Sequence, residues 1–244
     1  MCLGEWFSLF EISLILLENH DQVNYTRKLV IPDIHGCSKT FEALLEKIHL
    51  SHSDLLILLG DYVDRGKDGK GVLDMLLKLQ DEAYQLRFLK GNHEEMLLAA
   101  HYKDYDEESL RLPRLGKSKG ITDENRNIYP QYLDLLKSMS IIIEIDEYII
   151  THGGVNFDSP SPLEDLHSMI WGGKGEYRAD KVNNKKVIHG HTPTELDVIK
   201  LAIENDASVI SLDNGCVYAK RQGMGNLLCL NLDTRELVVQ KNID

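Results

Sequence analysis

The stretch Leu29-Val30-Ile31-Pro32-Asp33-Ile34-His35-Gly36 decides the fold of this chain. A short apolar run ends here, and side chains that can bind metal follow at once. The same arrangement recurs twice: the run Leu55–Leu59 leads into Gly60-Asp61, and the run Leu86–Leu89 leads into Gly91-Asn92-His93. Runs this short, with turn residues behind them, are typical of buried strands.

A helical pattern follows each of the three runs. Phe41, Leu44, Leu45 and Ile48 recur at helical spacing, with Ser38 placed to cap the helix, and further helices are expected around Val72–Leu79 and Glu94–Ala100. Strand, loop and helix repeated in this order predict an α/β fold with parallel strands. Ligands in such folds bind beyond the carboxyl ends of the strands, so these polar side chains should form one site.

The second half of the chain is predicted to be rich in strands. We expect Ile141–Ile145 and Tyr148–Thr151 to pair across a tight turn near Asp146. The other expected strands are Val187-Ile188, Val209–Leu212, Leu227–Leu230 and Leu237–Val239. Tyr102–Gln131 is polar and weakly periodic, which predicts a helical or loop insertion on the surface. We divide the chain into an extension (residues 1–27), a packing helix or disordered segment, and one domain (residues 28–244).

Composition narrows the classes of partner. A net charge of −12 argues against general binding of nucleic acid, which needs Lys and Arg to displace counterions. The four cysteines suggest neither a disulfide framework nor a zinc knuckle, so we expect a reducing, cytoplasmic compartment. The apolar segment Phe7–Leu17 is too short to span a bilayer, and no Lys or Arg precedes it as in a secretory signal. We expect a monomer without a membrane partner.

The polar residues form a set suited to a pair of metal ions. Two metals about 3.5–4 Å apart can polarise a phosphoryl oxygen and activate water, and they need oxygen and imidazole ligands with one bridging carboxylate. Asp33 and His35 can reach one metal together, Asp61 can bridge, and Asn92 offers a carbonyl oxygen. His152 and His191 are added from the second half. Each residue alone is weak evidence, but five motifs in this order are not expected by chance.

The motifs Asp33-Ile34-His35-Gly36, Gly60-Asp61-Tyr62-Val63-Asp64-Arg65-Gly66 and Gly91-Asn92-His93-Glu94 resemble those of the calcineurin-like metallophosphoesterase superfamily, and more narrowly the phosphoprotein phosphatases. His152-Gly153-Gly154 and Gly190-His191-Thr192-Pro193 are similar to the bacterial and phage branch, which includes lambda phosphatase and diadenosine tetraphosphatase. The similarity spans roughly residues 28–239. It implies a four-layer α/β/β/α sandwich with mixed sheets and a serine/threonine phosphatase activity.

The resemblance also implies roles for individual residues. Asp33, His35 and Asp61 would bind the first metal; Asp61, Asn92, His152 and His191 would bind the second. His93 would protonate the leaving group, Asp64 would orient His93, and Arg65, with Asn92, would bind phosphate. Water held between the metals would attack directly, without a phosphoenzyme. Manganese is the expected metal, with iron and zinc as alternatives.

One position departs from the family pattern. Relatives often carry Arg one or two residues after the Trp that matches Trp171, whereas Gly172 and Gly173 follow here. Lys174 or Arg178 could supply the missing phosphate contact. The substrate therefore stays open between a phosphoprotein, or another small phosphoester, and a dinucleoside polyphosphate such as diadenosine tetraphosphate. A metal-binding regulatory protein without turnover is the third hypothesis.

Overall fold

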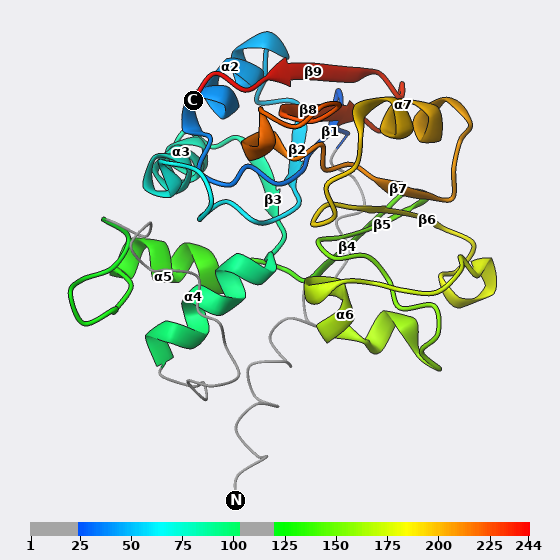
Figure 1. Cartoon of the computed structure of the whole chain (residues 1–244), viewed down its shortest axis with the longest axis horizontal. Coiled ribbons are helices and arrows are strands. Elements are labelled where there is room, and N and C mark those ends of the chain that lie inside the picture. Colours follow the sequence, from blue (N-terminus) through cyan, green and yellow to red (C-terminus); the bar gives the residue numbers. More distant parts are fainter. Residues whose placement is uncertain (1–23, 103–119) are drawn as a thin grey trace, which may run out of the picture.

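The computed structural model describes residues 24–102 and 120–244 (Figure 1). The expectations for Phe7–Leu17 and for most of the Tyr102–Gln131 insertion lie outside these residues. Within them the chain forms two mixed sheets and six α-helices. None of these helices is both long and apolar enough to cross a membrane.

The first sheet carries the three apolar runs of the opening motifs. Its strand order is β3-β2-β1-β8-β9, in which β1, β2 and β3 are parallel and β8 and β9 are antiparallel. The strands are β1 (Lys28–Ile31), β2 (Leu55–Leu58), β3 (Gln85–Phe88), β8 (Asn226–Asn231) and β9 (Leu237–Lys241). The helices α2 (Ser38–Lys47) and α3 (Gly69–Asp81) connect the parallel strands, as the periodicity predicts.

The second sheet has the order β4-β5-β6-β7, with β4 antiparallel to β5 and the other pairs parallel. Its strands are β4 (Ile142–Ile145), β5 (Tyr148–Thr151), β6 (Lys186–His189) and β7 (Val209–Ser211). Ile145 pairs with Tyr148, which leaves a two-residue turn at Asp146 as expected. Asp146 adopts a positive φ of 48°, a conformation that Asp tolerates in tight turns.

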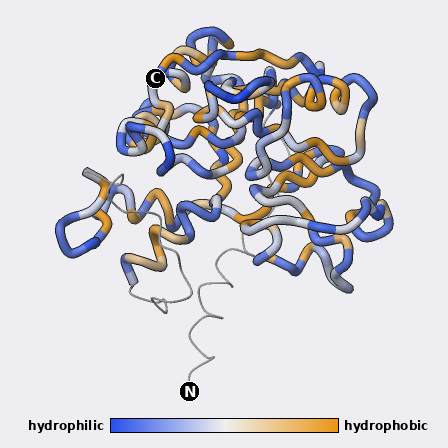
Figure 2. The backbone as a smooth tube through the Cα atoms, in the orientation of Figure 1, coloured by the Kyte–Doolittle hydropathy of each residue, from blue (hydrophilic) through white to orange (hydrophobic). Residues whose placement is uncertain are grey.

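The two sheets pack face to face, and helices cover the outside. Val30 and Ile57 of the first sheet share one buried cluster with Ile150 and Ile188 of the second. On the other face of the first sheet, residues of α2 and α3, such as Phe41 and Val72, form a separate cluster. The helix α6 (Leu166–Trp171) and the loops around it cover the second sheet (Figure 1). Figure 2 shows the hydrophobic residues following the strands. The predicted four-layer α/β/β/α sandwich is confirmed.

The remaining helices were only partly expected. α4 (Asn92–Tyr102) falls where the periodicity placed it, whereas α5 (Pro130–Lys137), α6 and α7 (Leu196–Glu204) did not stand out in a half that looked rich in strands. In α7, Ile199 and Ile203 face the core, but Val198 and Leu201 are exposed, so apolar residues cover more than one face and blur the period. Three short 3-10 turns complete the chain: η3 (Pro162–Glu164), η4 (Ala179–Lys181) and η5 (Cys216–Tyr218).

The cap of α2 differs from the expectation. The residue before the helix is Cys37, no side chain caps from that position, and Ser38 is the first helical residue. Ser38 instead donates its hydroxyl to Asp68. The carboxylate of Asp244, 204 residues away in the chain, accepts the backbone N–H of Thr40 (3.0 Å) and that of Lys39 (3.2 Å). The helix is therefore capped in space by the C-terminal end of the chain, which local spacing does not reveal.

Candidate metal centre

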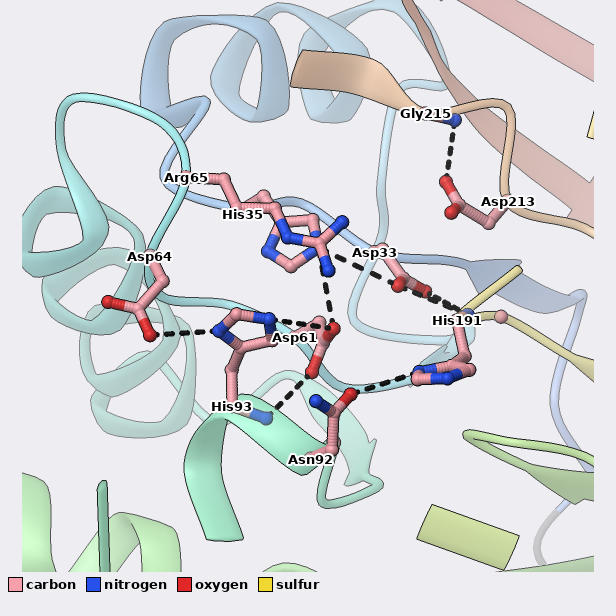
Figure 3. Close-up of polar contacts among 12 residues, drawn as sticks. Asp33, His35, Asp61, Asp64, Arg65, Asn92, His93, His191, Asp213 and Gly215 are labelled. Atoms are coloured by element: carbon pink, nitrogen blue, oxygen red, sulfur yellow. Dashed lines mark hydrogen bonds and ion pairs between the residues drawn. The ribbon is translucent and has the colours of Figure 1, made fainter. Parts of the chain in front are cut away.

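The residues expected to bind metal meet where strands of both sheets end (Figure 3). Asp33 follows β1, Asp61 follows β2, and Asn92 follows β3 as the first residue of α4. From the second sheet, His152 follows β5 directly and His191 follows β6. The shared placement at strand ends brings together residues up to 158 positions apart, as in the hydrogen bond that the backbone N–H of His191 donates to Asp33 Oδ1.

A first group of donor atoms consists of Asp33, His35 and Asp61, all buried. His35 Nδ1 lies 3.1 Å from the carbonyl oxygen of Val63, so Nδ1 carries the proton there and Nε2 keeps its lone pair. That Nε2 lies 3.3 Å from Asp61 Oδ2 and 3.9 Å from Asp33 Oδ2. Burial lowers the pKa of His35 to about 4, which keeps the ring neutral and able to bind a cation.

A second group lies on the other side of Asp61. His152 Nδ1 lies 2.8 Å from the carbonyl oxygen of Leu59, and its Nε2 is 3.4 Å from Asp61 Oδ1. Asn92 Oδ1 lies 3.2 Å from His152 Nε2 and 3.0 Å from His191 Nδ1. Burial lowers the pKa of His191 to about 4. Oxygen and nitrogen lone pairs of all four residues therefore face one small region.

Asp61 is the residue that both groups share. Donor atoms of His35, Asp61 and His93 all lie within 4.8 Å of one another, and so do those of Asp61, His152 and His191. Oδ2 of Asp61 is buried and has no hydrogen-bond partner among the residues that the structure describes. Such an atom is costly unless a cation compensates it. The donor set thus fits two divalent metals, with Asp61 as the residue that both would share, and these oxygen and imidazole ligands would suit manganese, iron or zinc.

Buried negative charge supports the same conclusion. Burial and the nearby carboxylates of Asp213 and Asp61 raise the pKa of Asp33 well above its ordinary value. Burial raises the pKa of Asp213 to about 7. Carboxylates packed this closely repel one another, and bound cations would remove that repulsion. Asp213 lies in a turn, where its Oδ1 accepts the N–H of Gly215 at 2.7 Å (Figure 3).

His93 stands beside the donor groups and has a partner of its own. Its Nδ1 lies 2.8 Å from Asp64 Oδ2, and its Nε2 is 3.9 Å from Asp61 Oδ2 (Figure 3). Burial acts to lower the pKa of His93, but the hydrogen bond to Asp64 and the charges of Asp61 and Glu94 outweigh it and raise that pKa. The carboxylate of Asp64 holds Nδ1 and favours the protonated form of the ring, which is the form that can donate a proton.

The backbone between Asp61 and Gly66 is held in an unusual shape. Asp61, Asp64 and Arg65 have φ values of 51°, 63° and 57°, each costing about 1–3 kcal/mol for residues with a side chain. Glu94 compensates, since its buried carboxylate accepts backbone N–H groups from Asp61 (2.7 Å), Tyr62 (2.9 Å), Val63 (3.3 Å) and Gly91 (3.0 Å). The motif contained Glu94, but sequence reasoning assigned it no role.

Two glycines lie directly against the carboxylates that are expected to bind metal. A Cβ atom at Gly91 would lie 2.2 Å from Asp61 Oδ1, and one at Gly190 would lie 2.1 Å from Asp33 Oδ1. Any side chain at either position would displace a carboxylate. In the sequence, Gly91 directly precedes Asn92 and Gly190 directly precedes His191. This placement could have drawn attention to the two glycines, but it does not reveal which atoms they approach.

Arg65, Lys174 and Arg178, which are expected to bind phosphate, lie in different places relative to the expected metal ligands. We call the six expected metal ligands together the cage: Asp33, His35, Asp61, Asn92, His152 and His191. The Arg65 guanidinium points toward it (Figure 3), and its Nη1 donates to the Tyr218 hydroxyl at 2.7 Å. Arg178 is exposed and pairs with Asp180, and Lys174 is exposed near Asn156. Within residues 24–102 and 120–244, neither of these two side chains has a hydrogen bond or ion pair with a cage residue. Gly172 comes closer: a Cβ there would lie 4.0 Å from His191 Nε2.

The fold and the cage define a class of protein, and the comparison with known families agrees. The model of the calcineurin-like phosphoesterase family matches residues 26–222, so the chain belongs to this family. That span includes all six residues expected to bind metal.

The curated proteins similar to this chain include a serine/threonine-protein phosphatase and symmetrical bis(5'-nucleosyl)-tetraphosphatases. The chain is 28% identical to serine/threonine-protein phosphatase 1 of Salmonella typhimurium over 210 residues, 80% of this chain and 89% of that protein. It is 47% identical to the symmetrical bis(5'-nucleosyl)-tetraphosphatase of Acidovorax sp., but over only 73 residues, 30% of this chain and 25% of that protein. Matches to other such relatives also span less than half of their length, such as 43% for the tetraphosphatase of Buchnera aphidicola.

Among solved structures, a serine/threonine phosphatase from Saccharomyces cerevisiae with similarity to human phosphatase PP5 shares the fold. The TM-score is 0.60 at 15% identity, covering 99% of this chain and 91% of that one. At this level of identity the likeness shows the fold alone.

Proposed function

We propose that this chain is a metal-dependent phosphatase that hydrolyses phosphate monoesters, with phosphoserine and phosphothreonine in proteins as its substrates. The observation that carries the proposal is the buried Oδ2 of Asp61, which lies between two groups of metal donors and has no hydrogen bond from any described residue, with the His93–Asp64 pair beside it. Family membership and the similarity to serine/threonine-protein phosphatase 1 along 80% of the chain support it.

Bound in the cage, two divalent metals would supply Lewis acidity and lower the pKa of water. The chain supplies the rest. Asp33, His35, Asp61, Asn92, His152 and His191 would hold the metals. Arg65 would bind the phosphate oxygens through its planar guanidinium group. His93 would donate the proton that an alkoxide leaving group requires, and Asp64 would keep that proton on the ring.

The test is a substrate panel run on purified protein with manganese, iron or zinc. We expect release of phosphate from phosphoserine and phosphothreonine peptides and from an aryl phosphate. The substitution His93→Asn should abolish turnover while the metal content is retained, which separates an enzyme from a metal-binding regulator. Absence of phosphate release with every metal would refute the proposal.

A second candidate is hydrolysis of a dinucleoside polyphosphate. The segment that is 47% identical to a symmetrical bis(5'-nucleosyl)-tetraphosphatase favours it, and so does the pair Gly172-Gly173, where relatives often have Arg. Backbone without side chains near His191 leaves room for an extended anion. Chromatography of a reaction with diadenosine tetraphosphate decides the matter, because only this candidate predicts nucleotide products.

A further inference from the structure

One aromatic ring at the rim of the cage carries two guanidinium groups. Tyr218 accepts a hydrogen bond from Arg65 Nη1 at 2.7 Å, and the Arg65 Cζ atom lies 6.0 Å from the ring centroid. Arg221 lies over the same ring, with its Cζ atom 4.3 Å from the centroid. This is the range of a cation–π contact. Tyr218 therefore links the expected phosphate-binding residue to a second cation.

The backbone around Tyr218 is well anchored. Tyr218 ends η5, which follows the Asp213 turn at the end of β7. The N–H of Tyr218 donates to the carbonyl oxygen of Gly215, and the N–H of Arg221 donates to that of Tyr218, both at 2.8 Å. Asn214, which is fully buried, donates to the carbonyl oxygens of Thr194 and Gly223. The ring thus projects from a loop fixed on both sides.

A fixed ring matters because Arg65 is exposed and has a long, flexible side chain. Arginine carries about 2 kcal/mol of rotamer entropy, part of which is lost when it binds an anion. A hydrogen bond that already holds the guanidinium lowers this loss. The hydroxyl accepts a hydrogen bond from Nη1 alone, so the contact fixes one end of the guanidinium group.

Arg221 is a further candidate for the phosphate contact missing after Trp171. Lys174 and Arg178 were the expected replacements, but within the described residues neither contacts Arg65 or Tyr218, and Arg178 is paired with Asp180. Arg221 is joined to Arg65 through a single ring, although it is far from Trp171 in sequence. Arg221 is identified by its contact with Tyr218 in the folded protein and not by its position in a sequence motif.

We propose that Tyr218 is a positioning residue that holds the Arg65 guanidinium for phosphate binding, and that Arg221 is the second cation that binds phosphate at this rim. The proposal rests on the proposed function, since it assigns residues to the same site.

The first experiment tests Tyr218 by calorimetric titration of the manganese-loaded protein with inorganic phosphate. Tyr218→Phe removes only the hydroxyl and keeps the ring beneath Arg221. We expect phosphate to bind about 3- to 10-fold more weakly, with KM raised by a similar factor and kcat much less affected. In an Arg65→Ala background, Tyr218→Phe should add nothing further. An equal additional loss in that background would overturn the positioning role.

Tyr177→Phe is the matched control. The Tyr177 hydroxyl donates to the carbonyl oxygen of Lys185 at 2.9 Å, just before β6 and therefore at the end of the sheet opposite the cage. This substitution removes a comparable hydrogen bond and should leave phosphate affinity and KM unchanged. A loss equal to that of Tyr218→Phe would show a general effect on stability and would contradict the proposal.

The second experiment tests Arg221. Arg221→Gln should weaken phosphate binding about 3- to 10-fold, whereas Lys220→Gln, the same charge change at the exposed neighbouring residue, should have little effect. Equal losses would mean that only net charge matters, and no loss would remove Arg221 from the site. If wild-type protein binds phosphate but hydrolyses no ester, the proposed function fails while these binding results still decide the inference. If it hydrolyses esters and both variants match it, only the inference fails.

Discussion

The Nδ1 atom of His93 lies 2.8 Å from Oδ2 of Asp64, and both side chains are buried beside Asp61. Because Asp64 accepts a hydrogen bond from Nδ1, Nε2 is the ring nitrogen that faces Asp61. The pairing sets the orientation of the ring together with its protonation. It also ties His93, the proposed acid, to the strained loop that carries Asp61, the proposed bridging ligand, so the two proposed functions share one local structure.

This pairing predicts how Asp64→Asn affects different substrates. A general acid contributes about 10²- to 10⁴-fold when the leaving group is a poor one. The kcat for a phosphoserine peptide should therefore fall by about 10²-fold or more, while an aryl phosphate, whose phenolate leaves readily, should lose much less. Asp180→Asn, at an exposed carboxylate paired with Arg178, is the control. Equal losses for the two substrates would mean that Asp64 does not act through leaving-group protonation.

The bridging position predicts that Asp61→Asn disrupts both metal sites at once. Loss of a partner that only orients a ligand costs about 10- to 100-fold in metal affinity, and loss of a shared ligand should exceed that range. Metal content per chain, measured after equilibrium dialysis against manganese, should fall from two toward zero. Substitution of His191 by Ala should retain one metal. Retention of one tightly bound metal in Asp61→Asn would contradict the bridge.

Much of the cage could be predicted because short-range patterns encode it. Asp33, Asp61 and Asn92 each follow an apolar run within a few residues, and the rule that ligands bind at strand ends brings them together. Tyr218 and Arg221 could not be found in this way. Their relation to Arg65 depends on how η5 returns to the β2 loop, a contact between residues 153 positions apart.

The same distinction explains what was missed in the fold. The Asp244 cap of α2 spans almost the whole described chain and leaves no local signal. The helix α7 exposes Val198 and Leu201, so its apolar residues lack a single face. Ser38 had the residue type of a cap but lies one position inside the helix. Long-range contacts and mixed exposure therefore set the limit of prediction from sequence.

The four backbone contacts of Glu94 predict that Glu94→Gln destabilises the protein. The amide replaces one acceptor oxygen by a donor that must face backbone N–H groups, leaving buried donors unsatisfied at about 1–3 kcal/mol each. We expect the free energy of unfolding to fall by about 2–4 kcal/mol, with loss of activity as the Asp61–Gly66 loop relaxes. Urea denaturation measures it. Glu95→Gln is the control, because Glu95 is half-buried and pairs only peripherally with Lys90 (3.3 Å). If the two substitutions lowered the free energy of unfolding equally, Glu94 would have no special part in holding the Asp61–Gly66 loop.

The ion pair between Arg27 and Asp54 predicts how stability depends on pH. Arg27 donates through Nε (3.0 Å) and Nη2 (2.5 Å) to the two oxygens of Asp54, which is 1% exposed. Burial acts to raise the pKa of Asp54, but hydrogen bonds from Arg27 and Ser51 outweigh it and hold that pKa below its ordinary value. A carboxyl with a lowered pKa in the folded state stabilises the protein above its unfolded pKa, and this stabilisation is lost as the pH falls through the folded pKa.

Asp54→Asn should therefore lower the free energy of unfolding by about 1–3 kcal/mol at pH 7. The difference from wild type should be constant down to about pH 4, the ordinary pKa of Asp, and should shrink below it as Asp54 of the wild-type protein becomes protonated. Urea denaturation at a series of pH values measures this. Asp180→Asn is the control, because the side chain of Asp180 is 67% exposed in its ion pair with Arg178. This substitution should change the free energy of unfolding by less than about 0.5 kcal/mol at every pH. A difference for Asp54→Asn that grows toward acid pH would reverse the sign and contradict the assignment, because it would mean that the folded protein favours the protonated form of Asp54.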